Sequence, residues 1–279
     1  MGSASIAISA DSGQDAGLRT GAELTVVVPT FNEAANVGQL ARLLESALAG
    51  VEWELIVVDD DSPDGTAARV RELARENPRL RCLQRVGRRG LSSACIEGML
   101  ASSAPYLAVM DGDLQHDETL LPDLLELLRS DAADIVVGSR YVEGGASDGL
   151  DARRVGFSQL ATRLSRPLIP DELQDPMSGF FMLQRPVFET TFRQLSGIGF
   201  KILLDIFASA PEPLRFRELP YHFRTREAGD SKLDSQVLWD YGMLLLDKLI
   251  GRWVPVRFVS FMPVSYTHLT LPTTLPRCS

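Results

Sequence analysis

The sequence predicts an α/β protein with a mostly parallel sheet flanked by helices. From residue 24 to residue 139, short apolar runs alternate with amphipathic stretches that are long enough for helices. Parallel strands are buried on both faces and need crossover helices, so this alternation is typical of a doubly wound sheet. The chain has 279 residues, of which 45% are hydrophobic, and this suits one such domain with appendages.

Each predicted element follows from its local pattern. Strands are expected where aliphatic and β-branched residues cluster, at 24–28, 53–59, 80–85, 106–111 and 134–139. Helices are expected where apolar residues recur at helical spacing, at 35–49, 64–77, 91–103 and 119–130. Beyond residue 140 the alternation weakens, and the expected elements are a helix at 155–168, a strand at 178–184, a helix at 199–210, a β segment at 214–225 and a long helix at about 234–250.

The ends of the chain differ in composition from its middle. Residues 1–22 lack a basic and apolar signal pattern, so a flexible tail is expected there, followed by the main domain at 23–233. The segment 234–262 is expected to form amphipathic helices, the start of a truncated membrane domain, with Trp253, Phe258 and Phe261 at a membrane surface. The Thr- and Pro-rich segment 263–279 reads as an unstructured, non-native tail. No run of about 18 apolar residues predicts a complete membrane span.

Charge and cysteine content exclude several classes of protein. The net charge is −9, and residues 1–139 hold 22 acidic against 11 basic side chains. An acidic half without a basic stripe argues against nucleic acid as the main partner and fits a half that holds a divalent metal. The three cysteines lack CxxC spacing, so neither a disulfide framework nor a structural zinc site is expected, and a reduced, cytosolic location is the default.

Ligands of such sheets bind beyond the carboxyl ends of the strands, so the residues there are the first candidates. After the first strand, Pro29 ends the ladder, and Phe31 and Glu33 are expected at a turn where a base or ribose could be held; a simple cap and turn is the alternative. The second strand ends in three successive carboxylates, which need a donor-rich ligand or a cation nearby. We expect Asp59 to bind ligand and Asp64 to cap the next helix.

The fourth strand runs into Asp111, Gly112 and Asp113, with Gln115 two residues further on. The glycine allows both carboxylates to reach one point, and hard oxygen ligands of this kind suit Mg²⁺ or Mn²⁺ bound to a nucleotide diphosphate. A solvated acidic loop is the alternative. His116 is expected to be a turn residue, and His222 and His268 lack metal-ligand spacing.

Two cationic features follow later in the chain. Arg140 comes directly after the fifth strand and could bind a diphosphate, although a salt bridge to a nearby aspartate is an equally simple interpretation. The loop 224–233 gathers Arg224, Arg226 and Lys232 around a glycine and could close over a polyanion or merely be solvated. The chain has no GxGxxG, GxxxxGK[ST] or GxSxG motif, which disfavours a Rossmann NAD site, a P-loop and a serine-hydrolase elbow.

Taken in order, VVPTFNE, VVDDDSPDGT, GLSSACIEGM, MDGDLQHDE, VGSRY, DPMSGFF, GFKILLDI and RTREAGDSKL resemble the polyprenol-phosphate (dolichol-phosphate) mannose synthases of the family 2 glycosyltransferases. The resemblance spans about residues 24–250 and implies a GT-A (Rossmann-like) fold at 23–233. It departs from the family at Phe31, where Tyr is more frequent, at Asp61, where a small residue is usual, and at Gly112, where Ala is frequent.

The resemblance also implies roles for individual residues. The implied nucleotide-sugar site comprises Pro29, Phe31, Glu33, Val57, Asp59, Asp111, Gly112, Asp113, Arg140, Arg226 and Lys232. The implied ligands of Mg²⁺ or Mn²⁺ are Asp111, Asp113 and Gln115. Catalytic roles are implied for Asp113, Arg140, Arg226 and Lys232.

The implied reaction is transfer of mannose from GDP-mannose to a polyprenyl monophosphate of the dolichyl or undecaprenyl type. Because the acceptor phosphate is already anionic, no general base is needed, and a single displacement predicts inversion. The alternative within the same fold is a glucosyl- or aminosugar transferase that uses a UDP-sugar. Non-catalytic binding of a sugar nucleotide is disfavoured by the intact Asp111, Asp113 and Gln115, and a soluble regulator would use the C-terminal aromatic segment only for docking. The expected location is the cytoplasmic face of the membrane, with peripheral attachment.

Overall fold

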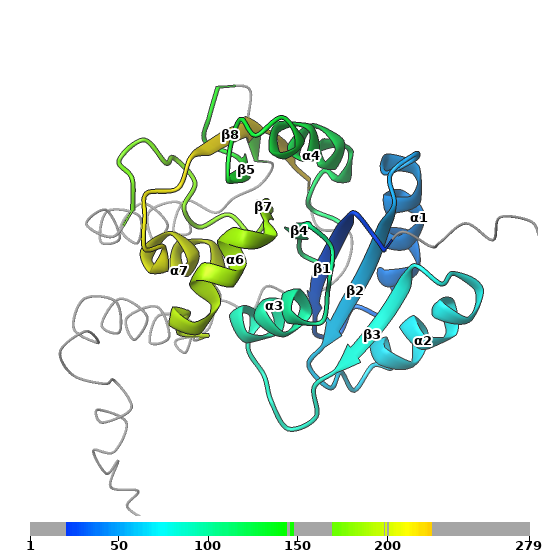
Figure 1. The fold of residues 1–279 in the computed structure, drawn as a ribbon. Helices are drawn as coiled ribbons and strands as arrows, with labels where there is room; N and C mark the ends of the chain where they lie inside the picture. Colours follow the sequence, from blue (N-terminus) through cyan, green and yellow to red (C-terminus); the bar gives the residue numbers. More distant parts are fainter. Residues whose placement is uncertain (1–20, 144–145, 148–168, 198, 200, 225–279) are drawn as a thin grey trace, which may run out of the picture.

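The computed structural model describes residues 21–143, 146–147, 169–197, 199 and 201–224. These residues form a seven-stranded sheet in the order β3-β2-β1-β4-β7-β5-β8, flanked by helices (Figure 1). The strands of this sheet are β1 (Leu24–Thr30), β2 (Trp53–Asp59), β3 (Leu80–Gln84), β4 (Tyr106–Val109), β5 (Ile135–Ser139), β7 (Phe181–Gln184) and β8 (Phe216–Pro220). A separate parallel pair joins β6 (Ala146–Ser147) to β9 (His222–Phe223).

The helices are α1 (Val37–Ala47), α2 (Thr66–Glu76), α3 (Leu91–Leu100), α4 (Leu121–Arg129), α6 (Arg185–Thr191) and α7 (Ile202–Ser209), with 3₁₀ turns at Glu118–Leu120 and Phe192–Gln194. The strands β3, β2, β1 and β4 are parallel neighbours, as the alternating pattern predicts. The strand β7 runs antiparallel between β4 and β5, and β8 is parallel to β5 at the edge. The prediction of a mostly parallel, helix-flanked sheet is therefore confirmed.

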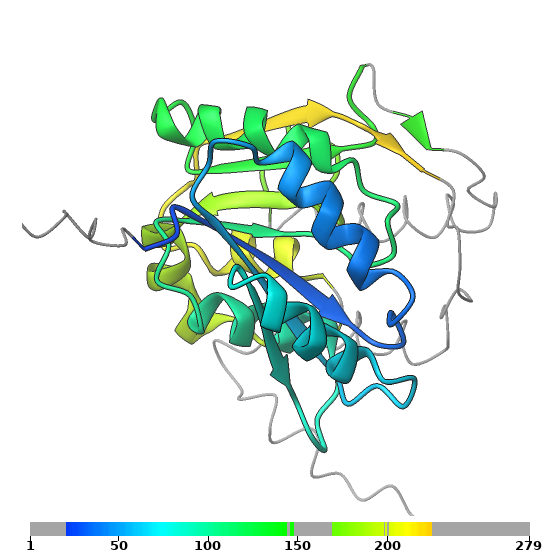
Figure 2. The same cartoon turned by 90° about the vertical axis from the view of Figure 1, so that its right-hand side faces the viewer.

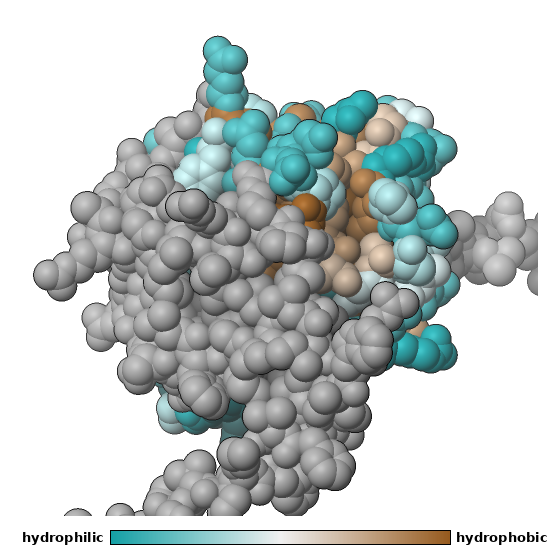
Figure 3. All heavy atoms as spheres, turned by 90° about the vertical axis from the view of Figure 1, so that its left-hand side faces the viewer, coloured by the Kyte–Doolittle hydropathy of each residue, from teal (hydrophilic) through white to brown (hydrophobic). Residues whose placement is uncertain are grey.

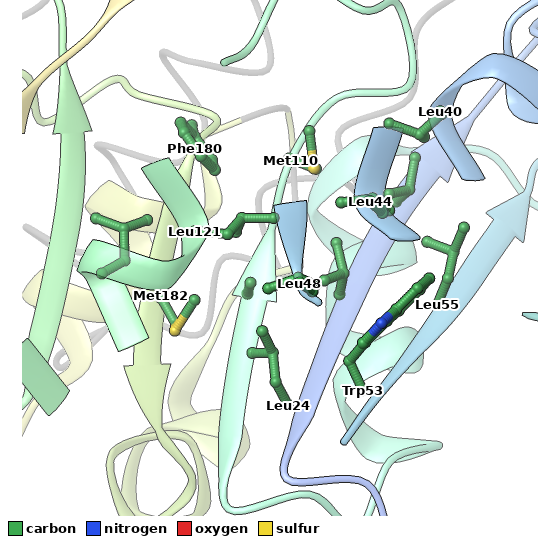
Figure 4. Close-up of a cluster of buried hydrophobic side chains, with 14 of the residues drawn as sticks. Leu24, Leu40, Leu44, Leu48, Trp53, Leu55, Met110, Leu121, Phe180 and Met182 are labelled. Atoms are coloured by element: carbon green, nitrogen blue, oxygen red, sulfur yellow. The ribbon is translucent and has the colours of Figure 1, made fainter. Parts of the chain in front are cut away.

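Hydrophobic residues fill both faces of the sheet because neighbouring strand residues point to opposite sides. Val26 and Val28 pack with α1, α2 and α4 on one face, whereas Val27 packs with α3, α6 and α7 on the other. Figure 2 shows α1 lying across the first face. Figure 4 shows Leu40 and Leu44 of α1 over the strands, with Trp53 at the start of β2.

The described surface is mixed in polarity. On the face shown in Figure 3, hydrophilic side chains surround a smaller group of hydrophobic ones. In the part of the chain that the structure describes, no helix is long and apolar enough to cross a membrane. The helices expected at 155–168 and 234–250, the amphipathic segment 234–262 and both predicted tails lie outside the described residues, apart from residues 21–22.

Candidate functional site

The carboxyl ends of β1, β2 and β4 lie at one edge of the sheet because these strands are parallel neighbours. The register pairs Thr30 with Asp59, so the turns that follow β1 and β2 begin side by side. The loop after β4 passes over the end of β1: a Cβ added to Gly112 would lie 3.2 Å from the Thr30 Cγ2 atom and 3.7 Å from the Glu33 Cγ atom. The structure thus brings three of the predicted clusters together.

Hydrogen bonds join the first two turns into one unit. The backbone N–H groups of Asn32, Glu33 and Ala34 donate to the side chains of Ser62 (2.9 Å), Thr66 (3.0 Å) and Asp64 (3.0 Å), respectively. The pKa of Asp64 lies below its ordinary value: burial acts to raise it, but hydrogen bonds from Thr66 and Ala34 outweigh that effect. The side chain of Asp64 also accepts from the N–H of Thr66, while the N-cap position itself is Gly65, one residue later than predicted.

Asp59 is fully buried at the end of β2 and is held by its neighbours. Its carboxylate accepts from the Ser62 N–H at 3.0 Å, from the Ser62 hydroxyl and from the Thr30 hydroxyl at 3.3 Å. Val57 is also fully buried, within the cluster packed beneath α1, whereas Pro29 and Phe31 are half-buried. The polar groups at this edge are therefore fixed in place before any ligand binds.

The middle carboxylate of the DDD run holds the loop that follows β3. Asp60 accepts from the Arg85 guanidinium at 2.8 Å and from the Gly90 N–H at 2.8 Å. Burial raises the pKa of Asp60, and the two hydrogen-bond partners oppose that rise. The same loop places the Arg89 guanidinium 4.4 Å from the centre of the Phe31 ring, which is a cation–π contact. Sequence reasoning did not single out Arg85, whose role depends on pairing with Asp60 in the turn after β2.

The loop after β4 brings Asp111 and Asp113 to the same edge. Burial raises the pKa of Asp111 and the charge of Asp113 adds to this rise, while His116, Lys201 and Arg140 oppose it. Asp113 is only 5% exposed and accepts from the Gln115 N–H at 3.2 Å. Leu114 has a φ of 64°, so the chain turns sharply between the two ends of this loop.

The donor set fits a hard divalent cation. Two crowded carboxylates carry an electrostatic cost that a cation would relieve. The Gln115 amide nitrogen donates to the Arg224 carbonyl at 2.9 Å, so the amide oxygen is the atom suited to a metal. Among the described residues, no group of three or more His, Cys, Asp and Glu side chains could hold a metal. Mg²⁺ sites commonly combine one or two carboxylates with substrate phosphates and water.

Arg140 forms a bidentate ion pair with Asp175, which is fully buried. The Arg140 Nε atom lies 2.9 Å from Oδ2 and Nη2 lies 3.0 Å from Oδ1. The pKa of Arg140 is raised: burial acts to lower it, but the hydrogen bonds and charge of Asp175 outweigh that effect. The guanidinium also lies over the rings of Tyr141 and Phe223, each at 5.4 Å. The salt-bridge interpretation is thus confirmed, with a partner from the DPMSGFF segment.

Lys201 is a second cation near this edge that sequence reasoning did not select. Burial, together with the charge of Arg140, lowers its pKa to about 8. Its Nζ atom donates to the Met177 carbonyl at 3.4 Å. The only signal in the sequence was its place in the GFKILLDI segment. The predicted Arg226 and Lys232 lie outside the described residues.

Comparisons with known proteins decide the family. The profile described as Glycosyl transferase family 2 matches residues 25–192. The chain belongs to glycosyltransferase family 2. It is 37% identical to a dolichol-phosphate mannosyltransferase of Pyrococcus furiosus over 78% of this chain and 61% of that protein. It is 36% identical to the dolichol-phosphate mannosyltransferase of Saccharomyces cerevisiae over 88% of this chain and 96% of that protein. The predicted family resemblance is confirmed.

Solved structures of glycosyltransferases have the same fold. Glucosyl-3-phosphoglycerate synthase of Mycobacterium tuberculosis superposes with a TM-score of 0.58 at 20% identity, over 82% of this chain and 80% of that one. A mannosyltransferase of Pyrobaculum calidifontis in complex with GDP-Man and Mn²⁺ gives a TM-score of 0.54 at 18% identity, over 84% of this chain and 65% of that one. These likenesses confirm the GT-A type of fold for the family 2 domain.

Proposed function

We propose that this family 2 glycosyltransferase transfers mannose from GDP-mannose to a polyprenyl monophosphate with inversion, giving polyprenyl-phosphate mannose. The observation that carries the proposal is the convergence of Asp111 and Asp113 with the Phe31–Glu33 turn at one sheet edge, beside the cations Arg140 and Lys201. The names of the relatives from Pyrococcus and Saccharomyces support the sugar and the class of acceptor. This chain spans 61% of the length of the Pyrococcus protein.

The donor would occupy the edge formed by the first three strand ends. Phe31 and Glu33, with Pro29 next to them, would line the nucleoside end, supported from beneath by the fully buried Val57 and Asp59, and Asp111, Gly112 and Asp113 would line the diphosphate end. Asp111, Asp113 and the Gln115 amide oxygen would hold Mg²⁺ or Mn²⁺. When bound, the cation would neutralise charge on the departing diphosphate.

The chain's own groups would bind and orient the reactants. Arg140 is held by Asp175 through Nε and Nη2, so Nη1 is the guanidinium nitrogen that would donate to a phosphate. Arg226 and Lys232 would contribute further positive charge from the loop 224–233. Because the acceptor phosphate is anionic near neutral pH, the protein needs to align it with the anomeric carbon and needs no general base. One in-line displacement then gives the inverted product.

The proposed location is the cytoplasmic face of a membrane, with peripheral attachment through the segment 234–262. A lipid acceptor requires the active edge to reach the bilayer surface, and aromatic residues next to arginines suit that interface. Replacement of Trp253, Phe258 and Phe261 by Ser should release the protein from anionic liposomes in a flotation assay. Continued binding of the triple variant would contradict attachment through this segment.

The direct test is calorimetric titration of GDP and UDP in the presence of Mg²⁺, Mn²⁺ or EDTA. The expected result is tighter, metal-dependent binding of GDP, which Asp113→Ala abolishes. Asp123→Asn is the matched control, because Asp123 is an exposed carboxylate in the first turn of α4, and it should bind like the wild type. Tighter binding of UDP would point to the UDP-sugar alternative, and no nucleotide binding would refute the transferase proposal. Transfer to polyprenyl phosphate and NMR of the product anomer then test the acceptor and the inversion.

A further inference from the structure

His116 is a buried polar side chain in the β4 loop, to which we assign the metal, and nothing in the proposed reaction gives it a task. It is 2% exposed. Its ring stacks on Phe180 with centroids 5.2 Å apart and an angle of 14°, and it contacts Tyr221 edge-on at 5.8 Å and Phe223 at 5.7 Å. Three aromatic rings from two other segments of the chain thus fix the plane of the imidazole.

Both nitrogens of this ring face Asp111. The Nδ1 atom accepts from the backbone N–H of Asp111 at 3.1 Å. A neutral imidazole that accepts at Nδ1 carries its proton on Nε2. The Nε2 atom lies 3.7 Å from Asp111 Oδ2, which is longer than a hydrogen bond but close enough for a favourable electrostatic contact.

The backbone of the loop is shaped to allow this contact. The left-handed conformation of Leu114, at φ 64°, returns the chain so that His116 lies against the residue where the loop began. The DPMSGFF segment also approaches this carboxylate: a Cβ added to Gly179 would lie 3.1 Å from Asp111 Oδ2. The Asp111 carboxylate is therefore close to both the imidazole and the backbone of the DPMSGFF segment.

We propose that His116 is a positioning residue, which fixes the backbone and carboxylate of Asp111 in the orientation that binds the divalent cation of the donor complex. The inference rests on the proposed function, because it requires metal-dependent nucleotide binding at this edge. Groups that orient metal ligands typically contribute about tenfold to hundredfold in metal affinity. A histidine suits this task because one ring nitrogen accepts from the peptide while the other presents a proton to the carboxylate.

Other contacts also join the β4 loop to the segment 221–224. The Arg224 N–H donates to the Gln115 carbonyl at 2.9 Å, and its guanidinium binds Glu118 at 2.8 Å and Asp117 at 2.9 Å. These bonds hold residues 115–118 independently of His116. Loss of the imidazole should therefore disturb Asp111 more than the remainder of the loop.

The test compares His116→Phe, which keeps the ring but removes both nitrogens, with His116→Asn, whose Oδ1 atom can replace Nδ1 as acceptor. Calorimetric titration of GDP with Mn²⁺ should show about tenfold or greater weakening for His116→Phe, and His116→Asn should recover most of that loss. GDP binding in EDTA should be the same in all proteins. The Phe188→Leu variant is the packing control: Phe188 is 1% exposed in the core on the α6 side and its ring packs on Phe192, so the variant should lower the unfolding midpoint yet keep the metal dependence.

Each outcome decides between the explanations. Wild-type metal dependence in folded His116→Phe would refute the inference and leave the proposed function intact, as would equal weakening by Phe188→Leu. If His116→Phe does not fold, His116→Gln replaces it, since it loses the acceptor at the δ position and should show the same weakening. Absence of metal-dependent GDP binding in the wild type would refute the proposed function and this inference together.

Discussion

The buried ion pair between Asp60 and Arg85 gives a sharp prediction about stability. Arg85 is 2% exposed, and its Nη1 atom donates to Asp60 at 2.8 Å and to the Gly90 carbonyl at 3.0 Å. The variant Asp60→Ala would leave this guanidinium buried without its main partner, and the Gly90 N–H would lose its acceptor. Loss of one partner of a buried pair costs about 3–5 kcal/mol.

The structure places the expected cost at the lower end of that range. Glu97 Oε1 lies 3.3 Å from Arg85 Nε and would remain after the substitution, as would the Ser93 hydroxyl. We therefore expect Asp60→Ala to lower the free energy of unfolding by about 3 kcal/mol. For a domain of this size that corresponds to a fall of about 6–12 °C in the unfolding midpoint.

A double-mutant cycle tests the reasoning. Arg85→Met alone should lower the free energy of unfolding by a similar amount, because it leaves the Asp60 carboxylate without its cation. If the two residues are coupled, the loss in the double variant should be smaller than the sum of the two single losses, by at least about 2 kcal/mol. Urea unfolding can be followed by tryptophan fluorescence, since Trp53 is 3% exposed in the core. An effect of Asp60→Ala below about 1 kcal/mol, or additive single variants, would refute the claim that the pair is energetically coupled.

Two further predictions concern the site. In Gly179→Ala the new Cβ atom would lie 3.1 Å from Asp111 Oδ2, so the Mn²⁺-dependent affinity for GDP should fall about tenfold. In the control Gly38→Ala the nearest atom to the new Cβ would be 3.8 Å away, so this affinity should not change. Calorimetric titration of both variants checks the prediction. The pKa of Lys201 is lowered to about 8 in the folded protein, below its value in the unfolded chain. The folded protein therefore becomes more stable as pH rises from about 8 towards the pKa of the unfolded lysine, and it loses that stability as pH falls through about 8. Lys201→Met should therefore raise the unfolding midpoint at pH 7 by an amount corresponding to at most about 3 kcal/mol and by much less at pH 10; a difference independent of pH would contradict the buried-charge explanation.

The sequence patterns predicted the parallel part of the sheet well. The runs at 24–28 and 53–59 lie within β1 and β2, and the run at 134–139 covers β5 with one additional residue, because a strand buried on both faces must be almost wholly apolar. The order of the strands within the sheet could not be predicted in this way. The apolar run at 178–184 indicates a strand, but no local pattern says that β7 runs antiparallel between β4 and β5.

Among the site residues, too, those defined by a local pattern could be predicted and those defined by a distant contact could not. The strand-end position of Asp111 and Asp113 could be predicted, since it depends only on where an apolar run stops. The partners Asp175 and Arg85 could not, because each acts through a contact with a residue 25 or more positions away. His116 was expected to be a turn residue, and its ring contacts with residues 180, 221 and 223 depend on the folded arrangement.

The three successive carboxylates after β2 show how the chain separates structural charge from charge that can act on a ligand. Asp60 is balanced by the buried Arg85, Asp61 accepts from the Gln84 amide at 2.7 Å, and Asp59 is held by hydroxyl and N–H donors. The cation that this crowded run requires is therefore supplied by the chain itself. Asp111 differs, because its pKa is raised by burial and by a second carboxylate, and its carboxylate lies 3.7 Å from the His116 imidazole, which is beyond hydrogen-bond distance. A divalent cation gains most where such a cost is still unrelieved, and this supports our proposal that the cation binds at the β4 loop and that the β2 loop helps to hold the nucleoside.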